Sequence, residues 1–127
     1  MPDTNRYNLF KNAKEYEVVN LTPHDVHIYH NDKLICTFPP SYIVARCRKS
    51  TVIVGYVKMG LGKVVKITRT TFSEVDGLPE PKEGVLLIVS KLVAEKYVGI
   101  RNDLVITNGH IRELTGEVKG CLSLGLI

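Results

Sequence analysis

The chain has 127 residues, of which 44% are hydrophobic and 24% charged, with a formal net charge of +4. This length suits one domain with a core of its own, and the composition excludes a disordered chain. No apolar run approaches the roughly 20 residues that span a bilayer, and the polar start carries no signal peptide. We therefore expect an intracellular protein without a membrane partner. Residues 1–15 are predicted to form an N-terminal arm, and residues 16–127 one β-rich domain.

The first predicted strands show the two-residue alternation of a half-buried sheet. Val26 and Ile28 point one way, while His27 and Tyr29 point the other way. Residues 30–33 form a turn, residues 34–38 return as the hairpin partner, and two prolines then end the ladder because proline has no amide proton to donate.

A basic hairpin is predicted next. Residues 42–47 and 51–58 are strands, residues 59–62 turn the chain, and residues 63–70 run back, with Lys63, Val65, Ile67 and Arg69 on one face. No acid interrupts the basic residues of this stretch, which are Arg46, Arg48, Lys49, Lys58, Lys63, Lys66 and Arg69. Such segregation of charge indicates a surface that faces phosphates or a complementary surface of another copy.

The remaining elements surround one central strand. Residues 72–84 are rich in glycine and proline and predict a loop. The continuous apolar run 84–89 predicts a strand buried on both faces. Ser90 is expected to cap a short helix over 91–97. Residues 104–106 form a strand, Asn108-Gly109 a hairpin-type turn, and 110–114 pair with 118–122. The fold class is mainly β, a small β-barrel-like or sandwich fold with one short helix; an α+β fold is the alternative.

The chain contains an Asn-Leu-Thr-Pro-His motif at 20–24, a Gly-Leu-Pro-x-Pro loop within 71–81, and the segments 88–93 and 101–105. Together these segments resemble a small family of uncharacterised bacterial, phage and mobile-element proteins. The resemblance covers residues 17–124. Ser73 and Thr107 depart from the glycine and proline expected there. The resemblance implies a related fold and a viral or mobile-element origin, and it implies no chemistry.

The turn over residues 20–25 is the first candidate site. It combines Asn20, Thr22, a rigid proline, His24 and Asp25 at the mouth of a strand, where small β domains often bind ligands. An ordinary turn is the competing interpretation, with Asn20 or Thr22 bonded to the local backbone. Other candidate contacts to an anionic ligand are Arg46, Arg69 and Arg101, together with Ser90 at the start of the helix.

Catalytic and metal motifs are incomplete. His24, His27 and His30 cannot meet at one zinc ion on a straight strand, because their side chains alternate and His24 lies about 20 Å from His30. Ser90 lacks the glycines of a nucleophile elbow. Three unevenly spaced cysteines, Cys36, Cys47 and Cys121, favour free buried thiols, with one disulfide as the alternative. We expect no metal and no cofactor.

Four functions are therefore compared. The leading hypothesis is a non-enzymatic domain, encoded by a virus or mobile element, that binds a small anionic ligand such as a nucleotide. If it is viral, it acts in the host cytoplasm. The alternatives are a nucleic-acid-binding protein that uses residues 46–69, a small hydrolase that uses His24 with Glu74 or Asp103, and a homo-oligomeric, self-associating structural protein.

The absence of Gln and the abundance of Val, Lys and Glu indicate a thermophilic source, against which seven asparagines weigh.

Overall fold

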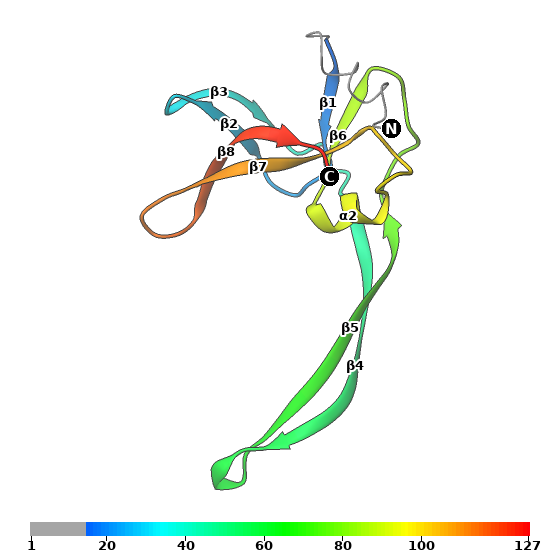
Figure 1. Cartoon of the computed structure of the whole chain (residues 1–127), viewed down its shortest axis with the longest axis vertical. Coiled ribbons are helices and arrows are strands. Elements are labelled where there is room, and N and C mark those ends of the chain that lie inside the picture. The colour runs from blue at the N-terminus through cyan, green and yellow to red at the C-terminus, as the bar shows by residue number, and fades with distance from the viewer. Residues whose placement is uncertain (1–14) are drawn as a thin grey trace.

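The computed structural model of the chain describes residues 15–127 (Figure 1). The N-terminal arm predicted for residues 1–15 lies almost wholly outside the described residues. The described elements are β1 (Glu17–Asn20), β2 (Val26–His30), β3 (Lys33–Phe38), β4 (Arg46–Lys58), the 3-10 turn η1 (Gly60–Gly62), β5 (Val64–Asp76), β6 (Val85–Ile88), α2 (Lys91–Lys96), β7 (Leu104–Arg112) and β8 (Val118–Gly125). The fold is mainly β, as the sequence predicts.

A six-stranded sheet forms the body of the molecule, in the order β1-β6-β7-β8-β2-β3. It curls into an open half-barrel (Figure 1). The pairs β1–β6, β6–β7 and β2–β8 are parallel, whereas β7–β8 and β2–β3 are antiparallel. The predicted β-barrel-like architecture is confirmed in this coarse form.

The central strand β6 separates two apolar clusters. Leu87 and the following Val89 belong to a cluster that also contains Leu21, Ala45, Val93, Ala94 and Leu104. Ile88 points into the second cluster, with Val26, Ile28, Val105 and Cys121. Residues 86–89 are all buried, so the continuous apolar run of the sequence is a strand covered on both faces.

The short helix α2 closes the first cluster. The Ser90 hydroxyl accepts a hydrogen bond from the Val93 amide at 3.3 Å, which is the predicted N-cap. Val93 and Ala94 face the core. The Ser90 hydroxyl therefore has a structural role as the cap of α2, although the residue is exposed.

Strands β4 and β5 form a separate two-stranded ribbon, which we call the hairpin (residues 46–76). It extends far from the body, with its tip at one end of the molecule's long axis (Figure 1). Only its base is embedded, because Cys47 pairs with Val75 and both pack against the first cluster. The two strands are 13 residues long each. The hairpin is longer than the sequence predicted.

Three local predictions are wrong. Residues 42–47 do not form a strand; Tyr42 has φ 69°, and β4 starts only at Arg46. The predicted loop 72–84 begins at Gly77, because residues 72–76 continue β5. Asn108-Gly109 is not a hairpin turn. Both residues lie inside β7, since β8 pairs with β7 on either side of Gly109, whose φ of 69° is accommodated within the strand.

Candidate functional site

The Asn20 side chain is fully used inside the protein. Asn20 is 2% exposed, and its Nδ2 donates to the carbonyls of His24 at 2.7 Å and Phe38 at 2.9 Å. Its Oδ1 accepts from the Thr22 amide at 2.9 Å and the Thr22 hydroxyl at 2.6 Å. An asparagine amide has two donors and two acceptor lone pairs, and all four are occupied. Asn20 therefore pins the turn to β3 and offers nothing to a ligand.

The Asn20 carbonyl also binds the segment that follows β3. The Ser41 hydroxyl donates to the Asn20 carbonyl at 2.8 Å, and the Ser41 amide donates to it at 3.0 Å. The Thr22 hydroxyl also lies 3.1 Å from the His24 carbonyl. Residues 20–25 are predicted to form either a ligand site or an ordinary turn. The hydrogen bonds of Asn20 and Thr22 are those of an ordinary turn.

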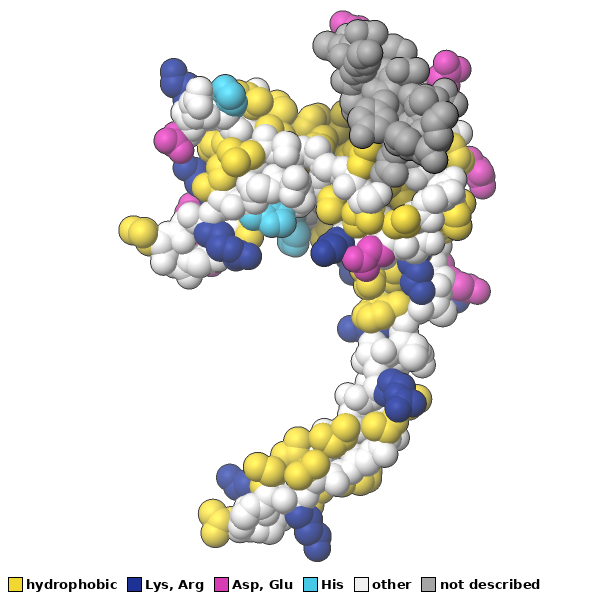
Figure 2. All heavy atoms as spheres, in the orientation of Figure 1, with side chains coloured by type: hydrophobic (Ala, Val, Ile, Leu, Met, Phe, Trp, Pro, Cys, Tyr) yellow, Lys and Arg dark blue, Asp and Glu magenta, His cyan; other side chains and the backbone are white. Residues whose placement is uncertain are grey.

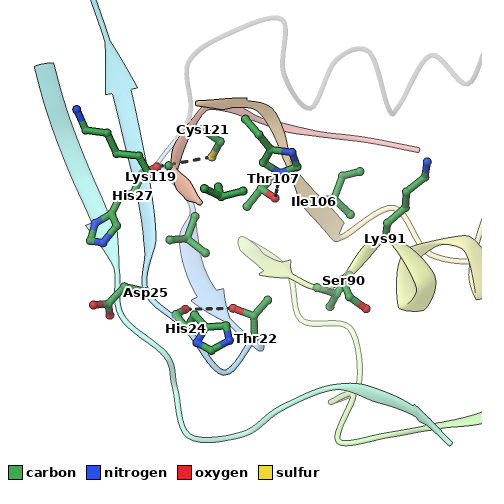
Figure 3. Close-up of a pocket in the computed structure, with 15 residues that line it drawn as sticks. Thr22, His24, Asp25, His27, Ser90, Lys91, Ile106, Thr107, Lys119 and Cys121 are labelled. Carbon is green, nitrogen blue, oxygen red and sulfur yellow. Dashed lines mark hydrogen bonds between the residues drawn. The ribbon is translucent and has the colours of Figure 1, made fainter. Parts of the chain in front are cut away.

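Three of the predicted site residues do border one cavity. Thr22, His24 and Ser90 line a hollow of about 470 Å³ on the body (Figure 3). We call this hollow the groove. Arg46 borders a neighbouring hollow of about 430 Å³, which shares Thr22 and Ser90 with the groove.

The groove has an apolar floor and a polar rim. Its floor consists of Val26 of β2, Val89 just after β6, Ile106 of β7, and Val118 and Cys121 of β8. Burial raises the pKa of the Cys121 thiol, so this sulfur stays protonated and unreactive at neutral pH. The rim carries His24, Asp25, His27, Lys91, His110 and Lys119.

Several rim side chains already have partners within the chain. The His27 ring bonds the Thr37 hydroxyl at 2.8 Å, and the His110 ring bonds the Thr107 hydroxyl at 2.9 Å. The Lys119 ammonium lies 4.8 Å from the centre of the Tyr29 ring and points away from the groove (Figure 3). The groove is thus chiefly apolar. The sequence did not predict it, because its floor is assembled from segments that lie far apart in the chain.

The other two predicted arginines do not join this cavity. Arg101 donates to both carboxylate oxygens of Asp103, at 2.9 and 2.6 Å, and to the Pro79 carbonyl at 2.9 Å. The two charged side chains are only 10% and 11% exposed. Arg69 lies on the hairpin opposite Val52. The seven predicted contact residues are therefore spread over four places: the groove, the buried hydrogen bonds of Asn20, a buried ion pair and the hairpin.

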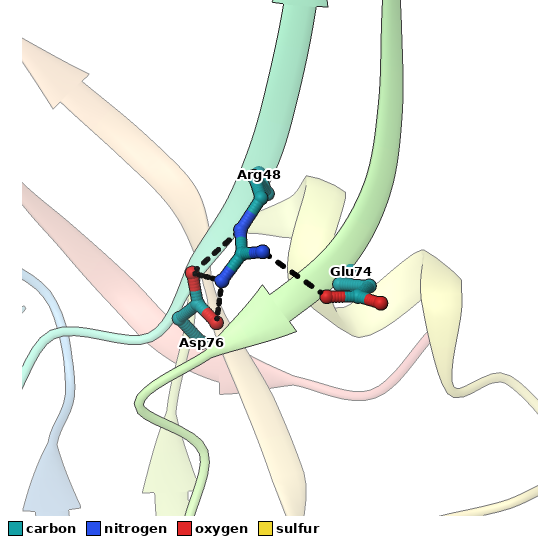
Figure 4. Close-up of polar contacts among 3 residues, drawn as sticks. All are labelled: Arg48, Glu74 and Asp76. Atoms are coloured by element: carbon teal, nitrogen blue, oxygen red, sulfur yellow. Dashed lines mark hydrogen bonds and ion pairs between the residues drawn. The ribbon is translucent and has the colours of Figure 1, made fainter.

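The same contacts bear on the hydrolase hypothesis. Asp103 is bound to Arg101, and Glu74 lies 3.3 Å from Arg48 at the base of the hairpin (Figure 4). Arg48 also donates to the Asp76 carboxylate through Nε and Nη2, at 3.0 to 3.2 Å. Glu74 and Asp103, the two proposed partners of His24, are thus each paired with an arginine instead of with the His24 ring. Within the described residues, no group of histidines, cysteines and carboxylates is arranged to hold a metal ion.

The hairpin is the more unusual surface of the molecule. Cys47, Gly55 and Val75 are partly buried, and every other residue of its two strands is exposed. Its exposed large hydrophobic residues are Val52, Ile53, Val54, Tyr56, Val57, Met59, Leu61, Val64, Val65, Ile67 and Phe72. Figure 2 shows hydrophobic side chains along much of the hairpin's length.

Apolar residues occupy both faces of the ribbon. The register places the pairs Val57–Val65 and Gly55–Ile67 on one face, and Tyr56–Lys66 and Lys58–Val64 on the other. This confirms the predicted division of residues 63–70 between two faces. In the described part of the chain no further strand pairs with either edge of the hairpin.

Comparison of the chain with protein-family models, curated proteins and solved structures finds no match. The family resemblance of the motifs at 20–24 and 71–81 therefore stays a prediction. Among the described residues there is no helix of the length and apolar character needed to cross a membrane.

Proposed function

We propose that this protein is a self-associating structural subunit whose hairpin binds a second copy of the chain. The observation that carries the proposal is the uncovered ribbon, with aliphatic side chains on both faces. An isolated two-stranded ribbon is only marginally stable in water, and exposed apolar strands with free edges are surfaces for pairing with another chain.

The total surface area supports an interface of substantial size. The accessible surface of the chain is 9598 Å². A compact monomer of 14.2 kDa exposes about 6,800 Å², so this chain exposes about 2,800 Å² more than expected. Stable protein interfaces bury about 800 Å² on each partner. The exposed strands of the hairpin contribute to this excess.

Charge distribution favours contact between the hairpin and the body of another copy. The hairpin carries Arg46, Arg48, Lys49, Lys58, Lys63, Lys66 and Arg69 against Glu74 and Asp76, a net charge of +5. The whole chain has +4, so the rest of the chain sums to −1. Two hairpins packed together would repel each other, whereas a hairpin packed on a body does not meet that repulsion.

Nucleic acid is the competing partner of the same surface. No acid lies between Lys49 and Phe72, and a two-stranded ribbon fits the major groove of DNA. Interfaces with nucleic acid are, however, polar and dominated by contacts to phosphate. Val57, Val65 and Ile67 make a largely aliphatic face, which favours a protein partner.

Sedimentation velocity over a wide range of protein concentrations tests the proposal. We expect wild type to associate as concentration rises, and the triple variant Val57→Thr, Val65→Thr, Ile67→Thr to associate at least about tenfold more weakly, a difference of about 1.4 kcal/mol. Threonine keeps the β-branched shape and strand propensity. The matched control is Leu34→Thr with Ile35→Thr, two exposed residues of β3, which should associate as wild type does.

Two results would overturn the proposal. One is a wild-type chain that stays monomeric at every concentration. The other is binding of wild type to a DNA or RNA duplex, measured by fluorescence anisotropy, that weakens steeply with salt and is lost on removal of Lys58, Lys63 and Lys66 while self-association is absent. A steep salt dependence is the signature of phosphate contacts.

A small anionic ligand such as a nucleotide is the second candidate function. The specific observation in its favour is that Thr22, His24 and Ser90 border one cavity. A thermal shift of wild type by a nucleotide, absent in His24→Ala, would support this function. The absence of any shift across a nucleotide panel would remove it.

A further inference from the structure

We infer that the groove is the acceptor for the hairpin tip of a second copy. This inference rests on the proposed function and adds to it the surface that receives the hairpin. A contact between a hairpin and a body needs an acceptor on the same chain, and the acceptor has to complement apolar side chains. The tip of the hairpin and the floor of the groove have that complementary character.

The tip presents a leucine in an unfavourable backbone conformation. Leu61 is 99% exposed and has φ 65°, between Gly60 and Gly62. The hairpin turn requires positive φ here, and Leu61 fills a position that glycine or asparagine adopts at lower cost, so the turn holds a leucine side chain out in solvent. Met59, which is 52% exposed, donates its amide to the Lys63 carbonyl at 2.7 Å and closes the turn. The tip is thus a fixed knob made of Leu61 and Met59.

The groove has the size and chemistry to receive this knob. Its volume is about 470 Å³, and Val26, Val89 and Cys121 on its floor are buried residues. The cavity that one truncated core side chain leaves, about 150 Å³, already binds a benzene molecule. The groove is therefore large enough for two aliphatic side chains. The tip of the same chain lies at the far end of the long axis, so the knob has to come from another copy (Figure 1).

The charges around the two surfaces are compatible. Lys58 and Lys63 flank the knob, and the exposed carboxylate of Asp25 lies on the rim of the groove. Lys119 is directed over Tyr29 and away from the groove. Lys91 lies on the opposite side of the groove from Asp25 (Figure 3). A tip that enters on the Asp25 side pairs a lysine with a carboxylate and avoids Lys91.

A knob and a groove on different surfaces define a heterologous contact. Such contacts close into rings when the rotation between copies allows it, and otherwise they extend as open chains. The inference therefore predicts that each copy has one donor end and one acceptor end, which can be inactivated separately.

Two single substitutions test this arrangement by sedimentation velocity. Leu61→Asp removes the donor, and Val118→Asp places a charge in the acceptor at a half-exposed position. We expect each variant alone to lose association, and an equimolar mixture of the two to form one-to-one dimers, because each retains the surface that the other lacks. Leu114→Asp is the matched control; Leu114 is fully exposed on the β7–β8 turn, outside the groove, and the variant should associate as wild type does.

The failure of this inference differs from failure of the proposed function. If Leu61→Asp loses association and Val118→Asp keeps it, the groove is not the acceptor, while the hairpin still binds a second copy. If both variants associate as wild type does, the knob-and-groove contact is wrong. Should Val118→Asp lose its β-sheet circular dichroism, His24→Lys replaces it, because a lysine beside Asp25 repels Lys58 and Lys63 of the incoming tip. This exposed residue contributes only its carbonyl to the hydrogen bonds of the Asn20 turn.

Discussion

The body and the hairpin of this protein differ in how far their side chains are satisfied within one chain. The body buries a polar residue, Asn20, and supplies every hydrogen bond that its side chain can make. The hairpin leaves valines and isoleucines in water on both of its faces. Because the polar groups of the Asn20 turn are paired within the body and the apolar faces of the hairpin are uncovered, we expect the body to determine stability and the hairpin to act mainly through association. The following substitutions examine that division.

The largest effect is expected at Asn20. Asn20→Ala leaves the Phe38 carbonyl and the Thr22 amide without this partner and leaves the His24 carbonyl with only the Thr22 hydroxyl, and each orphaned part-buried group costs about 1–3 kcal/mol. We expect the free energy of unfolding to fall by about 4 kcal/mol. Urea unfolding followed by circular dichroism measures it, since the chain has no tryptophan. Asn102→Ala, at an exposed position, is the control; a loss below about 1 kcal/mol at Asn20 would contradict the proposed network.

A second prediction compares an ion pair in the body with one on the hairpin. Arg101→Ala leaves the buried Asp103 carboxylate unpaired and should lower the free energy of unfolding by about 3 kcal/mol. Arg48→Ala removes contacts to Glu74 and Asp76, whose side chains are 72% and 59% exposed, and should cost at most about 1 kcal/mol. Equal losses in the two variants would show that the hairpin base is as tightly built as the body.

How far sequence predicts this fold depends on the range of the interactions. The strand at residues 85–88 and the Ser90 cap are local patterns, and both are confirmed. The Asn20 turn also has local partners, but its bond to Phe38 spans 18 residues and could not be inferred from spacing. Asn108-Gly109 has the signal of a turn, yet pairing with β8 carries the strand through it.

The hairpin shows a different limit. Alternation correctly predicted strands and divided their residues between two faces. It could not predict that the faces stay uncovered, because apolar residues on both faces are equally typical of a strand inside a sheet. The available signal was the run of cations without an acid between Lys49 and Phe72, since such a run is rarely buried in a core. The same limit applies to the candidate site. Each contact residue was predicted from its own local sequence, and the tertiary structure places these residues in different parts of the molecule.

The junction between the two regions gives the third prediction. Gly77 has φ 81°, and a Cβ added there would collide with the Val44 carbonyl oxygen. Gly77→Ala therefore adds steric overlap to backbone strain and should lower the free energy of unfolding by about 2–3 kcal/mol. Gly116→Ala is the control, because Gly116 has φ 89° but open space around its Cβ position; it should cost about 1 kcal/mol. If the two variants lose the same amount, the close approach to Val44 does not hold the junction.

The smallest effect on the free energy of unfolding is expected on the hairpin, which is the surface that the proposed function requires. Val57→Thr with Val65→Thr should change the free energy of unfolding of dilute protein by no more than about 0.5 kcal/mol, because both residues are about half exposed. Val93→Thr makes the same change at a residue that is 0% exposed, and burying its hydroxyl should cost about 2 kcal/mol. The same hairpin pair should nevertheless weaken association in the sedimentation experiment. A residue whose change leaves folding intact and removes association has its role outside the monomer. A large loss of stability at Val57 and Val65 would instead show that the hairpin is part of the fold's own support.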